Sequence, residues 1–416
     1  MYNLHLSPEQ LAIRDTVRDF VAQEVKPFAL KSERLEALDR RLPVAILDQA
    51  SQLGLRTLML SEALGGAGAD SLTACIVAEE LAAGDPDIAA VLAETAWLGH
   101  VLFDGAMTGE QRDRFLPQFL GDDRYHLALA EDEPDRDAAL GIDYHRPLAR
   151  ATEIKTIATR TGKGEWIING IKHCVANAPL AKLFAVTART APQASGEAGA
   201  ATILVPRDAP GVMVSAHDGP DRWFHGACGA IKFVDCRVPA QYALATEGMG
   251  SLDHNAERGP PLLAAINLGI GRAAYEAALD YTQLRVQGGR RIVEHQAIGA
   301  KLAEIAIRLN IARNAVWQAA WAADHPQAIG DSSLRGLPLG LVAKVVTSEV
   351  VYHAAKDAAE CFGAMGVMRD MPLCKYVHDA LVCLHSRVGN GEAKLRIGEA
   401  LAGYRRPPSA AVLAAE

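Results

Sequence analysis

The amino-acid sequence predicts a mainly α-helical protein with a small β domain in the middle of the chain. Apolar residues recur at helical spacing over residues 1–120 and again over 241–416, whereas short alternating segments occupy 121–240. A chain of 416 residues is long enough for two or three domains that share large cores. We therefore expect an N-terminal helical domain (1–120), a middle β-barrel or sandwich (121–240) and a C-terminal four-helix bundle (241–416).

The clearest signals for single elements are a helix start and a turn. Ser7 is an N-cap, Pro8 stands at the first helical position and Gln10 completes a capping box. In the middle region Trp166-Ile167-Ile168 leads into Asn169-Gly170, which predicts a hairpin turn. Beyond it, alanine-rich runs predict three long bundle helices: Leu262 to Arg285, Gln296 to Ala323 and Leu339 to Glu360.

Composition and charge exclude several classes of protein. The net charge is −8 with both signs interspersed, which argues against a nucleic-acid surface. No apolar signal core and no membrane-spanning run stand out, so we expect no membrane contact and a cytoplasmic location. The histidines lack metal-ligand spacing, so no metal site is expected. The cysteines form no CxxC pair and are expected to be buried reduced thiols: Cys75, Cys174, Cys228, Cys236, Cys361, Cys374 and Cys383.

The most informative pattern lies in the C-terminal region. Arg285 is followed eleven residues later by Gln296, and Gly363 and Gly366 form a Gly-rich turn further on. A cation, an amide and a glycine turn on two helical segments suit the phosphates and adenine of a dinucleotide. Because the turn does not follow a strand, it is not the Rossmann fingerprint.

The pattern resembles the acyl-CoA dehydrogenase family of flavoproteins, and the likeness extends over nearly the whole chain. The order of helical, β and helical regions is that of the family. Short stretches resemble it at the expected places: Leu53-Gly54-Leu55, Leu64-Gly65-Gly66, Glu79-Glu80-Leu81, Glu110-Gln111, Leu116-Pro117, Trp166 to Lys172, Phe233-Val234-Asp235 and Val238-Pro239.

The resemblance implies FAD bound across a subunit interface. Arg285 and Gln296 would contact the adenosine and diphosphate, and Gly363 and Gly366 would let the backbone approach the coenzyme closely. The chain departs from the family here, because Gly288, Glu360 and Ala364 replace a phenylalanine, a glutamine and a glycine. An anionic Glu360 near a diphosphate would be unfavourable unless it turns away or is protonated.

This sequence retains fewer of the family's residues that contact the flavin ring than of those that contact the adenosine. Of the family's Thr-Glu-Pro-x-x-Gly-Ser stretch, only Glu133-Pro134 survives. Where the family has Trp-Ile-Thr, this chain has Cys174-Val175-Ala176, and the side chain of Ala176 cannot donate a hydrogen bond. Glu133, Ala176 and Asn390, the last in the C-terminal turn, complete the expected cofactor contacts.

The family's usual catalytic glutamate is missing. The matching stretch is Ser386 to Gly391, where Val388 or Arg387 takes its place, and neither can accept a proton. Some relatives carry the base at the start of an earlier helix, and here Glu257 before Arg258 is the candidate. The alternative is a loop carboxylate paired with Arg258. Glu392 is expected to lie on a solvated helix face.

Three functions follow from the resemblance. The first is an FAD-dependent acyl-CoA dehydrogenase acting on an acyl-CoA and passing electrons to an electron-transferring flavoprotein, as a homo-oligomer (dimer or tetramer). The second is a half-catalytic subunit of a heterotetramer, since the adenosine half of the site is better kept than the ring half. The third is a flavin oxidase, monooxygenase or desulfinating enzyme of the same fold.

Overall fold

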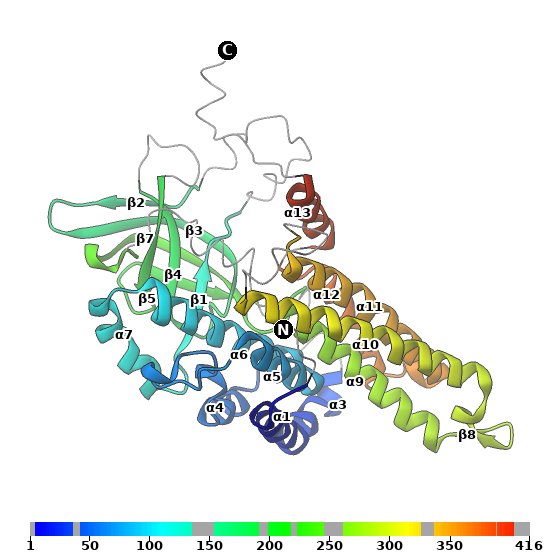
Figure 1. Ribbon diagram of the computed structural model, residues 1–416. Coiled ribbons are helices and arrows are strands. Elements are labelled where there is room, and N and C mark those ends of the chain that lie inside the picture. The colour runs from blue at the N-terminus through cyan, green and yellow to red at the C-terminus, as the bar shows by residue number, and fades with distance from the viewer. Residues whose placement is uncertain are drawn as a thin grey trace, which may run out of the picture.

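The computed structural model describes residues 5–35, 42–134, 154–190, 199–217, 223–244, 261–325, 337–387 and 389–402. A helical region comes first, strands occupy the middle of the chain, and helices return after them, which confirms the predicted fold class. In Figure 1 the sheet lies on the left, the N-terminal helices lie below it, and the long C-terminal helices extend to the right.

The N-terminal helical elements begin with a capped helix. Ser7 accepts a hydrogen bond from Gln10 N and the capping box is complete, as predicted. The buried pair α5 and α6 forms the centre of this region. The elements are α1 (Pro8–Phe20), η1 (Val21–Val25), α2 (Lys26–Ala29), α3 (Ser32–Leu35), α4 (Val44–Gln52), η2 (Leu55–Thr57), η3 (Glu62–Leu64), α5 (Ser71–Gly84), α6 (Pro86–Gly99), η4 (His100–Ala106) and α7 (Gly109–Gly121).

The strands of the described ranges form one main sheet. Their order is β1-β4-β2-β3-β7-β6, and β5 pairs with β4 outside this path. The long antiparallel pair of β3 and β7 forms its centre, and α6 packs against β1. The bounds are β1 (His126–Ala130), β2 (Ile157–Arg160), β3 (Glu165–Ala176), β4 (Ala181–Arg189), β5 (Ala200–Pro206), β6 (Val212–Ala216) and β7 (Cys228–Pro239), followed by η8 (Ala240–Tyr242).

The predicted hairpin turn at Asn169-Gly170 is wrong, because β3 runs through both residues. The Asn169 side chain bonds across to Asp235 on β7, at 3.1 Å to Oδ1 and 2.8 Å from the backbone N–H. The pairing register shifts between Ile168 and Gly170, so the dipeptide forms a bulge. A Cβ on Gly170 would lie 2.6 Å from the Cα of Thr156, so close packing requires this glycine.

The three long helices of the C-terminal region are confirmed within two residues of their predicted ends. They are α9 (Leu262–Leu284), α10 (Gln296–Asp324) and α11 (Leu339–Cys361). Buried alanines along each of them allow close packing of the helices. The remaining elements are β8 (Val286–Gln287), β9 (Arg290–Arg291), η9 (Ile292–Glu294), η11 (Gly363–Val367), α12 (Leu373–Cys383) and α13 (Asn390–Ala402).

One segment of the described chain is long and apolar enough to cross a membrane by length and composition. It comprises α6 and η4, Pro86–Ala106, and the sequence analysis did not single it out. The most apolar stretch of 18 residues in this segment is 72% buried inside the fold. Burial in the core accounts for its apolar composition, because a helix that is covered on all sides is apolar all round.

Candidate functional site

Arg285, Gln296 and the Gly-rich turn meet at one end of the bundle. Arg285 ends α9, and its N–H donates to Tyr281 O at 2.8 Å. The ring of Tyr281 stacks on Phe362, with centroids 4.0 Å apart, and Phe362 directly precedes Gly363. Arg285 and Gln296 are exposed. In Figure 1 this end, marked by β8, is the one farthest from the main sheet.

The two glycines of the turn have different local roles. Gly363 has φ +59°, and a Cβ there would meet nothing within 4 Å, so its backbone is open to a ligand. A Cβ on Gly366 would lie 2.3 Å from Ala359 O, so this glycine lets the turn pack against α11. Their role in cofactor binding stays a prediction.

The unfavourable anion expected at Glu360 is compensated. Glu360 forms an ion pair with Lys301 of α10, and Lys356 is 3.8 Å away. The hydrogen bond from Lys301 lowers the pKa of the Glu360 carboxyl, which therefore stays ionised. The side chain is half exposed, so water screens the pair. Glu360 thus contributes little net charge to the surface around Arg285.

Asn390 lies near the opposite end of the bundle. Its Oδ1 accepts from Lys344 of α11 at 2.6 Å and from Ser348 at 3.0 Å. Lys344 and Cys361 are separated by about 25 Å along α11. The predicted cofactor residues of one chain are therefore divided between two distant regions. Asn390 lines a hollow of about 430 Å³ together with Glu349, Tyr352, His353, Leu384, His385, Gly389 and Gly391.

Ala176 ends β3 within a strained segment. Cys174 and Asn177 on either side have φ of +52° and +62°, values that side chains other than glycine seldom adopt. Asn177 holds the segment against α6, because its Nδ2 donates to Val91 O at 3.0 Å and to Thr95 Oγ1 at 3.1 Å. Ala176 itself is half-buried. The end of β3 is therefore fixed to α6 by a buried amide.

Glu133 is engaged inside the β domain. Its Oε1 lies 2.7 Å from Lys172 Nζ, and both side chains are buried. The backbone N–H groups of Lys155 and Thr156 donate to it at 2.6 and 3.0 Å. Burial alone would raise the pKa of Glu133, but Lys172 and these hydrogen bonds hold it below the usual value. These contacts give Glu133 a structural role, and a contact with the flavin stays a prediction.

The C-terminal turn is tied to α6 by an ion pair that the sequence analysis missed. Arg387, with φ +56°, bonds to Oε2 of Glu94, whose side chain is 9% exposed. The two residues are 293 positions apart, and Glu94 lies on an apolar helix. The spacing of residues in the sequence therefore does not predict this ion pair. α6 thereby connects the end of β3 with the C-terminal turn. Glu257 and Val388 lie outside the described residues.

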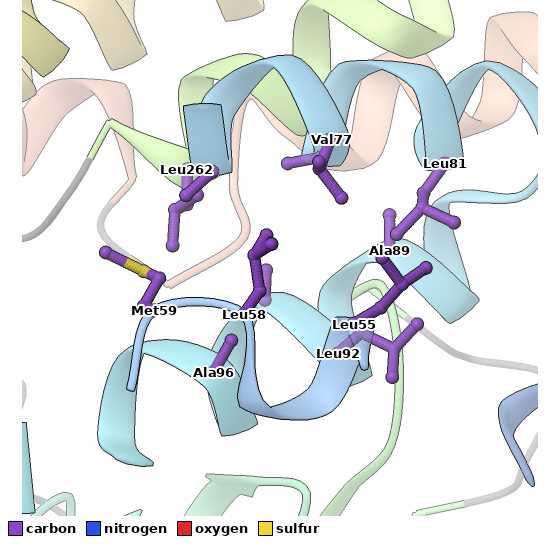
Figure 2. A pocket seen from close by; sticks show the side chains of 12 residues that line it. Leu55, Leu58, Met59, Val77, Leu81, Ala89, Leu92, Ala96 and Leu262 are labelled. Carbon is purple, nitrogen blue, oxygen red and sulfur yellow. The ribbon is translucent and has the colours of Figure 1, made fainter. Parts of the chain in front are cut away.

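An apolar cavity lies between α5 and α6. Its lining comes from η2 and the residues after it, from α5 and α6, and from Leu262 at the start of α9, and Figure 2 shows these side chains directed toward one another. The volume is about 10 Å³, room for one water at most, so its apolar lining stays dry. The lining residues are Leu55, Leu58, Met59, Ala74, Val77, Ala78, Leu81, Ala89, Leu92, Ala93, Ala96 and Leu262.

The residues fit a dinucleotide at two points. Asn390 Nδ2 is a buried donor with no acceptor in the described part of the chain, a condition that costs about 1–3 kcal/mol until an acceptor arrives. At the other end of the bundle, Arg285 presents an exposed guanidinium beside an open glycine backbone. Within the described ranges, no group of three His, Cys, Asp or Glu side chains suits a metal ion.

Comparison with known families gives matches along most of the chain. The model described as acyl-CoA dehydrogenase, N-terminal domain, matches residues 7–123. The middle-domain model of the same family matches residues 148–225, and its C-terminal-domain model matches residues 246–397. The three models match in the order of the helical, β and helical regions.

Individual proteins are similar over almost their full length. An acyl-CoA dehydrogenase of Bacillus subtilis (strain 168) is 30% identical over 387 residues, covering 91% of this chain and 94% of the relative. The solved butyryl-CoA dehydrogenase from Megasphaera elsdenii has a TM-score of 0.83 at 25% identity. The match covers 96% of this chain and 100% of that one. PigA, solved with FAD and proline, has a TM-score of 0.81 at 21% identity, over 96% of this chain and 99% of that one. At this identity the likeness shows a shared fold alone.

Proposed function

We propose an α,β-dehydrogenation of an acyl-CoA thioester, because the chain belongs to the acyl-CoA dehydrogenase family of FAD-dependent oxidoreductases acting on CH–CH groups. The observation that carries this function is the match of all three family domains, in order, to one chain. The solved relative from Megasphaera elsdenii is named for butyryl-CoA, which supports an acyl-CoA as the substrate class.

We propose that two copies of the chain hold each coenzyme. Arg285 and Gln296 lie at the far end of the bundle from Asn390, so they would contact the diphosphate and adenine of a coenzyme whose ring lies near Ala176 of the other copy. Exposed apolar residues support such an assembly: Ile307 and Ile311 lie one turn apart on α10 and are 60% and 59% exposed. We also propose a dimer or tetramer in the cytoplasm, with an electron-transferring flavoprotein as the electron acceptor.

The reaction requires one carboxylate and one hydride acceptor. A base removes the proton from Cα, the hydride leaves Cβ, and a double bond forms between the two carbons. FAD, when bound, supplies the acceptor for the hydride. Arg387 cannot act as the base, since a guanidinium has no lone pair to offer. We propose Glu257 as the base, with the Arg387–Glu94 ion pair closing the place that the family's glutamate occupies.

A half-catalytic subunit is the second candidate, and the Arg387–Glu94 pair favours it. A chain whose C-terminal turn carries a cation paired to a buried acid has lost the family's usual base position. In a mixed assembly a partner chain would supply the base and ring contacts. A flavin oxidase, monooxygenase or desulfinating chemistry, which does not use that glutamate, is the third alternative.

The test is anaerobic reduction of the bound flavin by acyl-CoA. The purified chain should be yellow, and its visible absorption should bleach when a suitable acyl-CoA is added without oxygen. Glu257→Gln should still bind FAD and substrate but bleach about 10²–10⁴-fold more slowly. Glu304→Gln is the control, because Glu304 is an exposed carboxylate paired with Arg308 on α10.

Each outcome separates the candidates. Full bleaching in Glu257→Gln removes Glu257 as the base and leaves the dehydrogenase function standing. A colourless chain that turns yellow only with a related partner chain identifies the half-catalytic subunit. Rapid reoxidation of the reduced flavin by air identifies an oxidase or monooxygenase. A chain that takes up no FAD under any of these conditions contradicts all three.

A further inference from the structure

Lys344 is a buried lysine that the proposed reaction does not use. It lies in the second turn of α11, and 4% of its surface is exposed. Its ammonium donates a hydrogen bond of 2.6 Å to Oδ1 of Asn390 at the start of α13. Burying an ammonium is unfavourable unless hydrogen bonds compensate it, so this contact ties the two residues together.

The ammonium of Lys344 fixes the orientation of the Asn390 amide. Ser348, one helical turn after Lys344, lies with Oγ 3.0 Å from the same Oδ1 and 3.0 Å from Val345 O, so its single proton serves either acceptor and does not set the amide. An ammonium carries donors only, so the amide oxygen must face α11. Exchanging the amide oxygen and nitrogen would set the NH₂ group against the ammonium. Nδ2 therefore points away from Lys344, and its direction is set by the charge on α11.

Nδ2 of Asn390 is left as a donor without an acceptor among the described residues. Native proteins leave few buried donors in this condition, and each calls for an explanation. Asn390 also lines the hollow between α11, α12 and α13, together with Tyr352, His353 and His385. Nδ2 itself is covered in this structure, so a ligand that enters the hollow and offers an oxygen or nitrogen lone pair would satisfy the amide after a small shift of the neighbouring side chains.

We propose that Lys344 is a positioning residue for the coenzyme: it orients the Asn390 amide so that Nδ2 donates to an acceptor atom of FAD. The inference rests on the proposed function, since it takes FAD as the ligand. Lys344 acts through Asn390 and does not itself touch the coenzyme. Without the ammonium, the amide is free to turn either end toward α11, and the donor is no longer preset.

The charge on Lys344 responds to pH in an accessible range. Burial lowers the pKa of Lys344 to about 8, although Cys383, Glu392 and Glu349 on α12, α13 and α11 raise it. His353 and His385 also face the hollow. A neutral amine can accept as well as donate, so it orients the amide less strictly. We expect FAD affinity to fall as the pH rises through about 8.

The experiment measures FAD affinity of the apoprotein by fluorescence titration at about pH 7 and about pH 9.5. It compares the wild type with Lys344→Met, Asn390→Ala, the double variant and the control Lys182→Met, an exposed lysine on β4. Lys344→Met should bind FAD about tenfold more weakly near pH 7 and lose the pH dependence. The double variant should bind no more weakly than Asn390→Ala. Lys182→Met should match the wild type.

Two results would overturn the inference while the proposed function stands. One is an unchanged FAD affinity in Lys344→Met, and the other is additive losses in the double variant. If Lys344→Met does not fold, the wild-type pH series decides, and an affinity that stays constant across pH 8 overturns the inference. A wild-type chain that takes up no FAD at either pH overturns both this inference and the proposed function.

Discussion

Thr95 connects a buried histidine to the end of β3. Its hydroxyl oxygen lies 3.1 Å from Nδ2 of Asn177 and 3.1 Å from Nδ1 of His126. The Thr95 oxygen accepts from the Asn177 amide, and its contact with Nδ1 of His126 runs in the direction that the tautomer of the ring sets. Burial lowers the pKa of His126 to about 4. The fold therefore holds this imidazole neutral.

We predict that His126 makes the folded protein sensitive to mild acid. Its pKa is about 4 when folded and near 6.5 when unfolded, so the unfolded chain binds more protons between these values. Stability is therefore lost as the pH falls from 6.5 toward 4, by about 3 kcal/mol in full. Urea unfolding of the wild type and His126→Gln at several pH values measures this loss. Equal pH slopes for the two proteins would contradict the prediction.

Residues that act through distant partners were beyond sequence reasoning. Lys344 and Asn390 are 46 positions apart, and Glu94 and Arg387 are 293 apart. The spacing of residues in a sequence predicts contacts within one helix or strand. These two pairs form only when separate helices pack together, so spacing could not predict them. Arg285 and Gln296 could be singled out because they flank a single helix-to-helix connection. Their cofactor role, like that of Ala176, stays a prediction until FAD binding is measured.

At the scale of elements, α9 and α5 approach so closely that a glycine is required between them. A Cβ on Gly269 would lie 2.4 Å from the carbonyl oxygen of Glu79 on α5. One turn further, Arg272 bonds to Glu79 and to Glu80, which lowers the pKa of the Glu80 carboxyl against the effect of burial. The C-terminal bundle is thereby joined to the N-terminal helices.

We predict that Gly269→Ala destabilises the protein, because the new methyl group forces the two helices apart. The expected loss is about 1–3 kcal/mol in the free energy of unfolding. Gly398→Ala on α13 is the matched control, since a Cβ there meets nothing within 4 Å. It should be neutral or stabilising by up to about 1 kcal/mol. Denaturant melts of both variants check the pair, and equal midpoints would refute the close-packing argument.

Elements with a strong local signal were predictable, and those decided by a neighbour were not. The long helices α9, α10 and α11 have a sustained apolar period, so their ends were predicted within two residues. The Asn169-Gly170 pair carries a strong turn signal, yet β7 supplies Asp235 as a partner and Thr156 packs over the glycine. Pairing across the sheet thus overrides the local preference.

At the scale of the whole molecule, the predicted coenzyme contacts of one chain lie in two regions. Arg285 and Gly363 are at the end of the bundle farthest from the sheet, and Asn390 bonds to Lys344, which lies about 25 Å back along α11. Exposed apolar side chains lie around the far end, including Leu284 at 81% and Val367 at 76%. In the proposed assembly, a second copy of the chain covers them and completes each site.

The FAD affinity of Arg285→Gln tests the central claim most directly. On this account the guanidinium binds the diphosphate, so the variant should lose about 1.5–3 kcal/mol of binding, a weakening of roughly ten- to hundredfold. Arg291→Gln serves as the control, because Arg291 is another exposed arginine on the same hairpin. An Arg285→Gln protein that binds FAD as tightly as the wild type, or no more weakly than Arg291→Gln, would contradict the account.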